Sequence, residues 1–254
     1  MAKDIVPDLL KSIESEFKLQ TDQSKKVRTM LEKLKEGVAT YEEAHDYAQE
    51  LGDILSLAFR NNLSVDVLPD GKMYYNIADR IVSATLKNSY ELVSDYSAEV
   101  QTLLNQTVGY TIKGQKAPLN EDKIVGIVDK LSDSDDFEMV KWLLDEVIVN
   151  FTESVVDETI ETNARFLQKT GVPSTVVRVA EARCCSWCDG LDGVYNYPDE
   201  VPAEAFQRHR HCRCKTLYYP GDRNKFQDVW DKTWSKYEDD DGQNKNWMER
   251  LCDS

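Results

Sequence analysis

Two short stretches of sequence decide how this chain is organised: Cys184-Cys185-Ser186-Trp187-Cys188 and Arg208-His209-Arg210-His211-Cys212-Arg213-Cys214. Together they hold five of the six cysteines and two of the three histidines. A Cys-x-x-Cys pair lets two thiolates reach one ion, and the second stretch supplies imidazoles and further thiolates. This layout is typical of a tetrahedral zinc site. We call Cys185–Cys188 the first knuckle and residues 208–214 the second knuckle.

The knuckles offer more candidate ligands than the four positions of a structural zinc site. The candidates are Cys185, Cys188, His209, His211, Cys212 and Cys214. From the second knuckle we favour His209 together with Cys212 or Cys214, which leaves His211 free to donate a hydrogen bond to a ligand. Cys184 is out of register with the pair, and Cys252 lies far from both knuckles.

Other uses of the cysteines fit the sequence less well. A thioredoxin-like redox pair needs βαβ surroundings, whereas these flanks are short and rich in turn residues. Disulfides of a secreted protein are disfavoured, because the first residues contain no apolar core of a signal peptide. Catalytic zinc is also disfavoured, because the sequence contains neither His-Glu-x-x-His nor the deaminase pattern. We therefore expect a structural Zn²⁺ cofactor, no enzymatic activity and no small-molecule substrate.

Charge and hydropathy limit the classes of partner. The chain has 31 basic and 46 acidic residues and a net charge of -15, which discourages non-specific binding of nucleic acid. Any contact with DNA must then be local. A membrane-spanning helix needs about eighteen or more consecutive apolar residues, and the sequence has no such run. We expect no transmembrane segment and no membrane anchor.

The second knuckle and the residue after it carry a dense group of cations: Arg208, Arg210, Arg213 and Lys215. These side chains could be solvated and offset the charge of the thiolates. They could equally contact phosphates or an acidic partner. The sequence leaves both interpretations open.

Residues 1–171 have the apolar periodicity of helices. It predicts helices over 5–19, from Thr21 or Asp22 to Gly37, from Thr40 to Asn61-Asn62, over 73–108, after Asn120, and over 137–171. Thr40 and Glu43 form a capping-box pattern, and the last helix would span roughly 50 Å. His45 has no second ligand type nearby, so we expect an exposed or hydrogen-bonded structural histidine.

After Gly171 the pattern changes from helix to strand. The β-branched run 174–180 leads to the first knuckle, and 215–219 leaves the second, so the two can pair while a metal closes the loop between them. The predicted fold is mainly α: a helical region 1–171, a small α+β zinc-stapled module 172–221, and an acidic aromatic tail 222–254. In the tail, Trp230 and Trp234 could pack on the body or dock a partner.

At the knuckles the sequence resembles phage minor head proteins of the Mu F type, the head-morphogenesis family. The matching residues are Cys185-Ser186-Trp187-Cys188, the turn Leu191-Asp192-Gly193, and His209-Arg210-His211-Cys212-Arg213-Cys214. The family pattern is a helical region, a Cys-x-x-Cys pair, a glycine turn and a final His-x-x-Cys-x-Cys. Family members commonly have Pro-Asn where this chain has Arg210-His211, which leaves open which histidine would bind the metal.

The resemblance implies a minor capsid protein inside the virion head, assembled in the host cytoplasm. Its expected partners are the portal or other head proteins and packaged DNA, and its expected role is head assembly or genome delivery. Two alternatives from other classes remain. One is a zinc-dependent nucleic-acid enzyme, suggested by histidines beside arginines, and the other is a cellular zinc-containing adaptor that docks through the aromatic tail.

Overall fold

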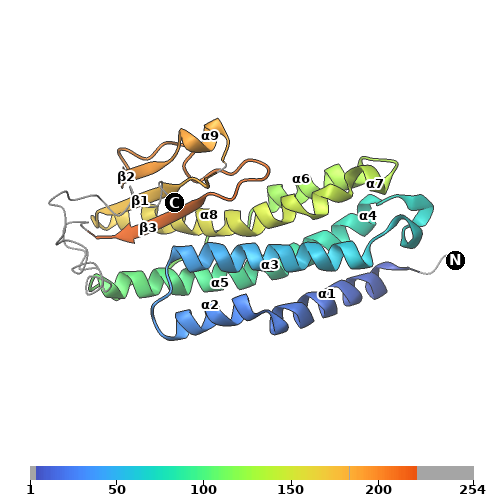
Figure 1. The fold of residues 1–254 in the computed structure, drawn as a ribbon, viewed down its shortest axis with the longest axis horizontal. Helices are drawn as coiled ribbons and strands as arrows, with labels where there is room; N and C mark the ends of the chain where they lie inside the picture. Colours follow the sequence, from blue (N-terminus) through green and yellow to red (C-terminus); the bar gives the residue numbers. More distant parts are fainter. Residues whose placement is uncertain (1–3, 183, 222–254) are drawn as a thin grey trace.

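The computed structural model describes residues 4–182 and 184–221. It has an elongated helical body with a small sheet packed along one end (Figure 1). The α-helices are α1 (Val6–Gln23), α2 (Lys25–Lys35), α3 (Tyr41–Asn62), α4 (Tyr75–Ala78), α5 (Ala84–Thr107), α6 (Glu121–Ser132), α7 (Phe137–Val140), α8 (Glu146–Lys169) and α9 (Ser186–Asp189). The prediction of a mainly α fold with a small β-containing part is confirmed. In the described part of the chain, no helix is both long and apolar enough to cross a membrane.

Side-chain caps fix where several helices begin. The predicted capping box of α3 is confirmed: the Thr40 hydroxyl accepts a hydrogen bond from the Glu42 amide, and Glu43 accepts one from the Thr40 amide. Asn120 caps α6 by accepting from the Lys123 amide at 3.1 Å. The predicted start of the second helix at Thr21 or Asp22 was wrong. The first helix continues to Gln23, and the hydroxyl of Ser24 caps α2.

Two of the predicted long helices are interrupted. The segment 73–108 forms α4 and α5 joined by a π-helical turn, Asp79–Ser83. The helix predicted over 137–171 is broken by a 3₁₀ turn, Lys141–Leu144, and by Asp145, whose φ and ψ are -117° and -102°. The remaining helix α8 has 24 residues, so it spans about 36 Å rather than the predicted 50 Å.

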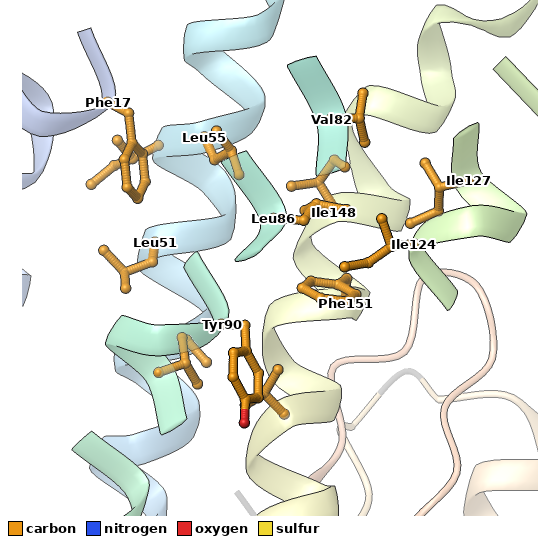
Figure 2. Close-up of a cluster of buried hydrophobic side chains, with 14 of the residues drawn as sticks. Phe17, Leu51, Leu55, Val82, Leu86, Tyr90, Ile124, Ile127, Ile148 and Phe151 are labelled. Atoms are coloured by element: carbon orange, nitrogen blue, oxygen red, sulfur yellow. The ribbon is translucent and has the colours of Figure 1, made fainter. Parts of the chain in front are cut away.

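The core lies between α3, α5 and α8, where aliphatic and aromatic side chains fill the space between the helices (Figure 2). Leu51 and Leu55 of α3 face Leu86 and Tyr90 of α5 within one buried cluster. The helices α3 and α8 approach closely at Gly52. A Cβ atom there would lie 2.8 Å from Cα of Val149, so this contact requires a residue without a side chain.

The sheet has three antiparallel strands in the order β2-β1-β3, with β1 at Ser174–Val179, β2 at Gly193–Tyr197 and β3 at Lys215–Pro220. The predicted pairing of the strands flanking the knuckles is confirmed, in a register that places Arg178 opposite Thr216. The strand β2 was not predicted, because Gly193 had been assigned to a turn. Val176 and Tyr218 belong to the same hydrophobic cluster as the helices. The sheet therefore packs on the helical body across the predicted boundary at Gly171. The predicted tail, 222–254, lies outside the described residues.

Candidate metal centre

The first knuckle is shaped by the short helix α9. Cys185 precedes α9 and Cys188 lies within it, and the Asp189 amide donates to the Cys185 carbonyl at 3.0 Å. The following turn is fixed to the sheet, because Asp192 accepts a hydrogen bond from the Ala180 amide at 2.7 Å. This one-turn geometry points the two sulfur atoms toward the second knuckle.

His209 meets both cysteines of the first knuckle. Its Nε2 lies 3.3 Å from Sγ of Cys185 and 3.0 Å from Sγ of Cys188. Its Nδ1 contacts the carbonyl oxygen of Arg210, which can only accept a hydrogen bond, so Nδ1 carries the proton and donates. The lone pair of Nε2 then faces the thiols, and this arrangement is common for metal-binding histidines.

Two groups of side chains in the described residues could hold a metal ion, and they share Cys188: Cys185, Cys188 and His209, and Cys188, Cys212 and Cys214. The ligand atoms within each group lie within 4.8 Å of one another. The sulfur atoms of Cys188 and Cys212 are 3.7 Å apart. Sulfur ligands of one tetrahedral ion lie about 3.8 Å apart when each bond is about 2.3 Å, so this spacing fits joint coordination.

The structure therefore brings together five of the six predicted ligands. The exception is His211, whose side chain is 57% exposed and whose Nδ1 lies 3.5 Å from a carboxylate oxygen of Glu146. Its backbone is left-handed, with φ of 63°. The ring of His211 lies beside Glu146 of α8 and belongs to neither group of possible ligands. Cys184 is partly buried beside the cluster, and Cys252 lies outside the described residues.

The environment gives the thiols different acidities. A hydrogen bond from Cys214, helped by the charges of Arg208 and Arg178, lowers the pKa of Cys212 to about 4 in spite of its burial. Burial raises the pKa of Cys188 to about 11. The pKa of Cys214 is raised by its hydrogen bond to Cys212 and by burial. The donors around Cys212 therefore favour negative charge on its sulfur.

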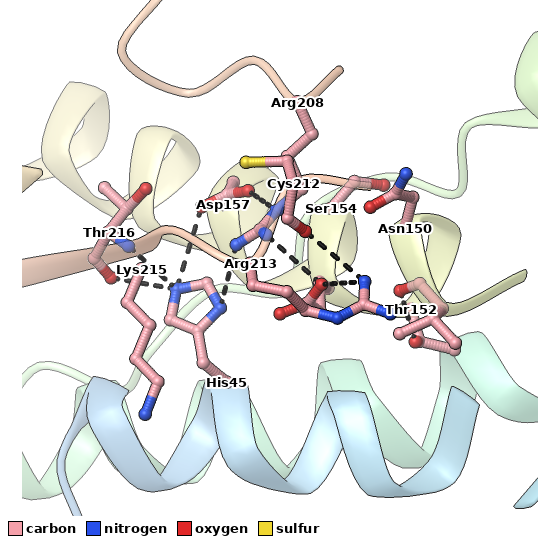
Figure 3. Close-up of polar contacts among 12 residues, drawn as sticks. His45, Asn150, Thr152, Ser154, Asp157, Arg208, Cys212, Arg213, Lys215 and Thr216 are labelled. Atoms are coloured by element: carbon pink, nitrogen blue, oxygen red, sulfur yellow. Dashed lines mark hydrogen bonds and ion pairs between the residues drawn. The ribbon is translucent and has the colours of Figure 1, made fainter. Parts of the chain in front are cut away.

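A polar stripe on α8 receives the second knuckle (Figure 3). We call this set of side chains the α8 stripe: Glu146, Asn150, Glu153 and Asp157. The Asn150 amide donates to the carbonyl oxygen of His209 at 3.1 Å. Glu146 accepts a hydrogen bond from Arg213 at 2.8 Å. The backbone beside the predicted ligand His209 is thus held by the helical body.

The innermost contact of the α8 stripe is made by Arg208. Its side chain is 3% exposed, donates through Nε to Asp157, and lies 3.2 Å from a carboxylate oxygen of Glu153. Burial opposes ionisation of Asp157, but the charges of Arg208 and Arg178 and a hydrogen bond from Thr216 hold the pKa of this carboxyl below its usual range. Burial raises the pKa of Glu153 to about 7. Of the two interpretations left open for these cations, neither solvation nor contact with phosphate or a partner describes Arg208, because its guanidinium is inside the protein.

His45 of α3 completes this buried network (Figure 3). Its Nδ1 lies 3.1 Å from Nη2 of Arg208, and its Nε2 lies 3.0 Å from the carbonyl oxygen and 3.1 Å from the amide nitrogen of Thr216. Burial lowers the pKa of His45 to about 3, and the ring is neutral. The sequence predicted that His45 is either exposed or hydrogen-bonded inside the protein. The structure shows the second, with 0% exposure of the residue.

The other predicted cations are largely engaged with the helical body. Arg213 pairs with Glu146, and Lys215 pairs with Asp46 of α3 at 2.6 Å. Arg210 is exposed and lies over the ring of Trp142, 3.7 Å from its centroid. The docking of the second knuckle on α8 has a signal in the sequence. The residues of the α8 stripe are spaced four, three and four positions apart, which places them on one face of the helix.

Comparison with protein-family models, with curated proteins and with solved structures finds no match to this chain. The chemistry of the site therefore rests on its own geometry. Thiols and an imidazole from α9 and the second knuckle form two groups of possible ligands that share Cys188. These side chains could bind a metal ion.

Proposed function

We propose that the knuckles form a structural zinc site. The observation that carries this proposal is that His209 contacts the sulfur atoms of Cys185 and Cys188, and that the sulfur of Cys188 lies 3.7 Å from that of Cys212. Thiolate and imidazole ligands in a tetrahedral set are the donors that Zn²⁺ prefers, and a set of four protein ligands leaves no position for a reactive water. The ion would link α9 to the second knuckle and contribute to folding.

Elemental analysis of the purified full chain tests the zinc site. We expect close to one zinc per chain, and we expect the double substitution Cys185→Ser, Cys188→Ser to lose it. The matched control is Cys184→Ser, which alters a neighbouring thiol outside both ligand groups and should keep the metal. Full zinc content in the double variant would refute the assignment.

We further propose that the chain is a non-enzymatic minor capsid protein of a phage head, associated with the portal. The support is the resemblance of the knuckle motif to the Mu F type, together with an elongated helical body that can lie along another helical assembly. Any contact with packaged DNA would be made without Arg208, Arg213 and Lys215, because these side chains are paired with acids of the helical body.

The proposed role is tested by the composition of purified virions and of their assembly intermediates. We expect the chain at low copy number in heads, and we expect it to be retained by immobilised portal protein. The virion measurement decides the matter: absence from heads at every stage of assembly would sink the role. The zinc measurement is separate from it, so a structural metal site could stand even if the head assignment fell.

A further inference from the structure

Arg178 of β1 is one of the largest fully buried side chains of the described chain, with 1% exposure. Burying a guanidinium is costly unless its charge is compensated. The helical body provides one carboxylate for it, since Nη1 lies 3.6 Å from Oδ1 of Asp157. The remaining contacts of Arg178 point to the metal centre.

The two terminal nitrogens of the Arg178 guanidinium donate to different partners. Nη1 donates to the hydroxyl of Thr216 at 2.5 Å, across the β1–β3 register that sets these residues opposite each other. Nη2 donates to the carbonyl of Gln207 at 3.3 Å and to Sγ of Cys212 at 3.5 Å. A rigid planar fork can hold all of these positions at once.

The hydrogen bond from Arg178 to Cys212 distinguishes two sulfur atoms, those of Cys212 and Cys214, that the sequence motif leaves equivalent. Cys212 and Cys214 are both buried and both belong to a candidate ligand group. Cys212 receives the charged donor, and its sulfur lies 3.7 Å from that of Cys188. A hydrogen bond from a charged donor stabilises negative charge on the sulfur that accepts it, and outer partners of this kind orient metal ligands.

We propose that Arg178 is a positioning residue of the metal centre, and that its hydrogen bond makes Cys212, rather than Cys214, the fourth ligand beside Cys185, Cys188 and His209. Cys214 then supports the site by donating to the ligand sulfur. This inference rests on the proposed metal site and is independent of the proposed role in a phage head.

The test uses the full chain titrated with Co²⁺, whose absorption reports the ligand set, and with Zn²⁺ in competition with a chelator. Arg178→Met should weaken metal binding by about 10- to 100-fold, the usual effect of losing an outer partner, and should shift the sulfur-to-cobalt absorption. Arg178→Lys keeps the charge without the fork, so it should recover part of the affinity. The matched control is Arg165→Met, which removes an exposed arginine paired with Glu161 on α8 and should change neither measurement.

The outcomes separate the two levels of the proposal. If the unaltered chain binds no cobalt or zinc, the metal site itself fails. If it binds them and Arg178→Met has the same affinity and spectrum, the positioning role fails. Should Arg178→Met not fold, Thr216→Val removes the hydroxyl that holds Nη1 and should produce a smaller shift in the same direction, whereas an unchanged spectrum would overturn the role.

The choice of sulfur has its own test in the same titration. Cys214→Ala should retain the sulfur-to-cobalt absorption of the unaltered chain, because a supporting thiol is lost and no ligand is. Cys212→Ala should change that absorption and weaken binding. The reverse pattern, with Cys214→Ala losing the absorption and Cys212→Ala keeping it, would overturn the assignment of the fourth ligand.

Discussion

Asp157 of α8 and Arg208 of the second knuckle form an ion pair whose side chains are 0% and 3% exposed. The carboxylate also faces Arg178 of β1 and His45 of α3. A single carboxylate thus compensates two buried arginines and also lies beside the neutral ring of His45. The docking of the second knuckle on the helices depends on this carboxylate.

Asp157→Ala should therefore be severely destabilising. Removing one partner of a buried pair leaves uncompensated charge, and the expected loss is about 3–5 kcal/mol in the free energy of unfolding. Glu161→Ala, one turn further along α8, removes an exposed partner of Arg165 and should cost less than about 1 kcal/mol. Urea unfolding of the metal-loaded chain measures both. Similar losses for the two variants would contradict a special role for the buried pair.

His45 and Glu153 should give opposite pH dependences of stability. The pKa of His45 falls from 6.5 to about 3 on folding, so below pH 6.5 the unfolded chain takes up a proton that the folded chain refuses. The neutral, buried ring of His45 therefore contributes its full stability above pH 6.5, and this contribution is lost as pH falls. The pKa of Glu153 rises from 4.5 to about 7, so its term is present at low pH and is lost as pH rises from 4.5 to 7.

Between pH 5 and 6 the pH-dependent contributions of His45 and Glu153 to stability largely offset each other in the unaltered chain. Substitution of either residue alone should reveal the contribution of the other. Relative to the unaltered chain, the free energy of unfolding of His45→Gln should fall by about 1.4 kcal/mol per pH unit as pH rises. Glu153→Gln should show the opposite relative slope. Denaturant unfolding of the three proteins at pH 5, 5.5 and 6 provides the comparison, and parallel curves would contradict both shifts.

Two glycine substitutions should have opposite effects. Gly52→Ala would place a Cβ atom 2.6 Å from Oγ1 of Thr152 and 2.8 Å from Cα of Val149. The helices α3 and α8 would have to separate, and overpacking of this kind costs about 1–3 kcal/mol or more. Gly126→Ala in α6 meets no atom within 4 Å and should stabilise by about 0.5–1 kcal/mol through helix propensity. Thermal unfolding distinguishes the two, and a stable Gly52→Ala chain would refute the close approach.

The two histidines of the second knuckle should differ in their importance for metal binding. His209→Ala removes an imidazole whose Nε2 lies within 3.3 Å of two sulfur atoms, so chelator competition should show a large loss of zinc affinity. His211→Ala removes an exposed ring near Glu146 and should keep the affinity within about threefold, below the effect of losing an outer partner. Equal losses would mean that both rings serve the ion.

The sequence allowed prediction of features that depend on local spacing. The capping box of Thr40 and Glu43 follows from a three-residue step, and the pairing of β1 with β3 follows from two β-branched runs that flank the knuckles. The break before α8 was hidden, because the 3₁₀ turn still buries Leu143 and Leu144. The apolar pattern therefore continues through a turn that is not α-helical.

The sequence pointed to the candidate ligands but not to the side chains that hold the second knuckle on the helices. Cys185, Cys188 and His209 were identifiable because chelation requires short spacings. The partners of Arg208 were not, because Asp157 lies 51 residues away and the contact exists only once α8 meets the second knuckle. A group of arginines beside cysteines resembles a basic surface in sequence, and only the docking shows that Arg208 faces inward.

The contact between His45 and Thr216 also has a consequence for the order of folding. The two residues are 171 positions apart in the chain, and contacts between distant residues form slowly because a long loop must close first. During synthesis, α3, α5 and α8 all leave the ribosome before β3. The helical body can therefore collapse early with the charged α8 stripe uncovered. Its carboxylates become buried only when the second knuckle and β3 pack against α8.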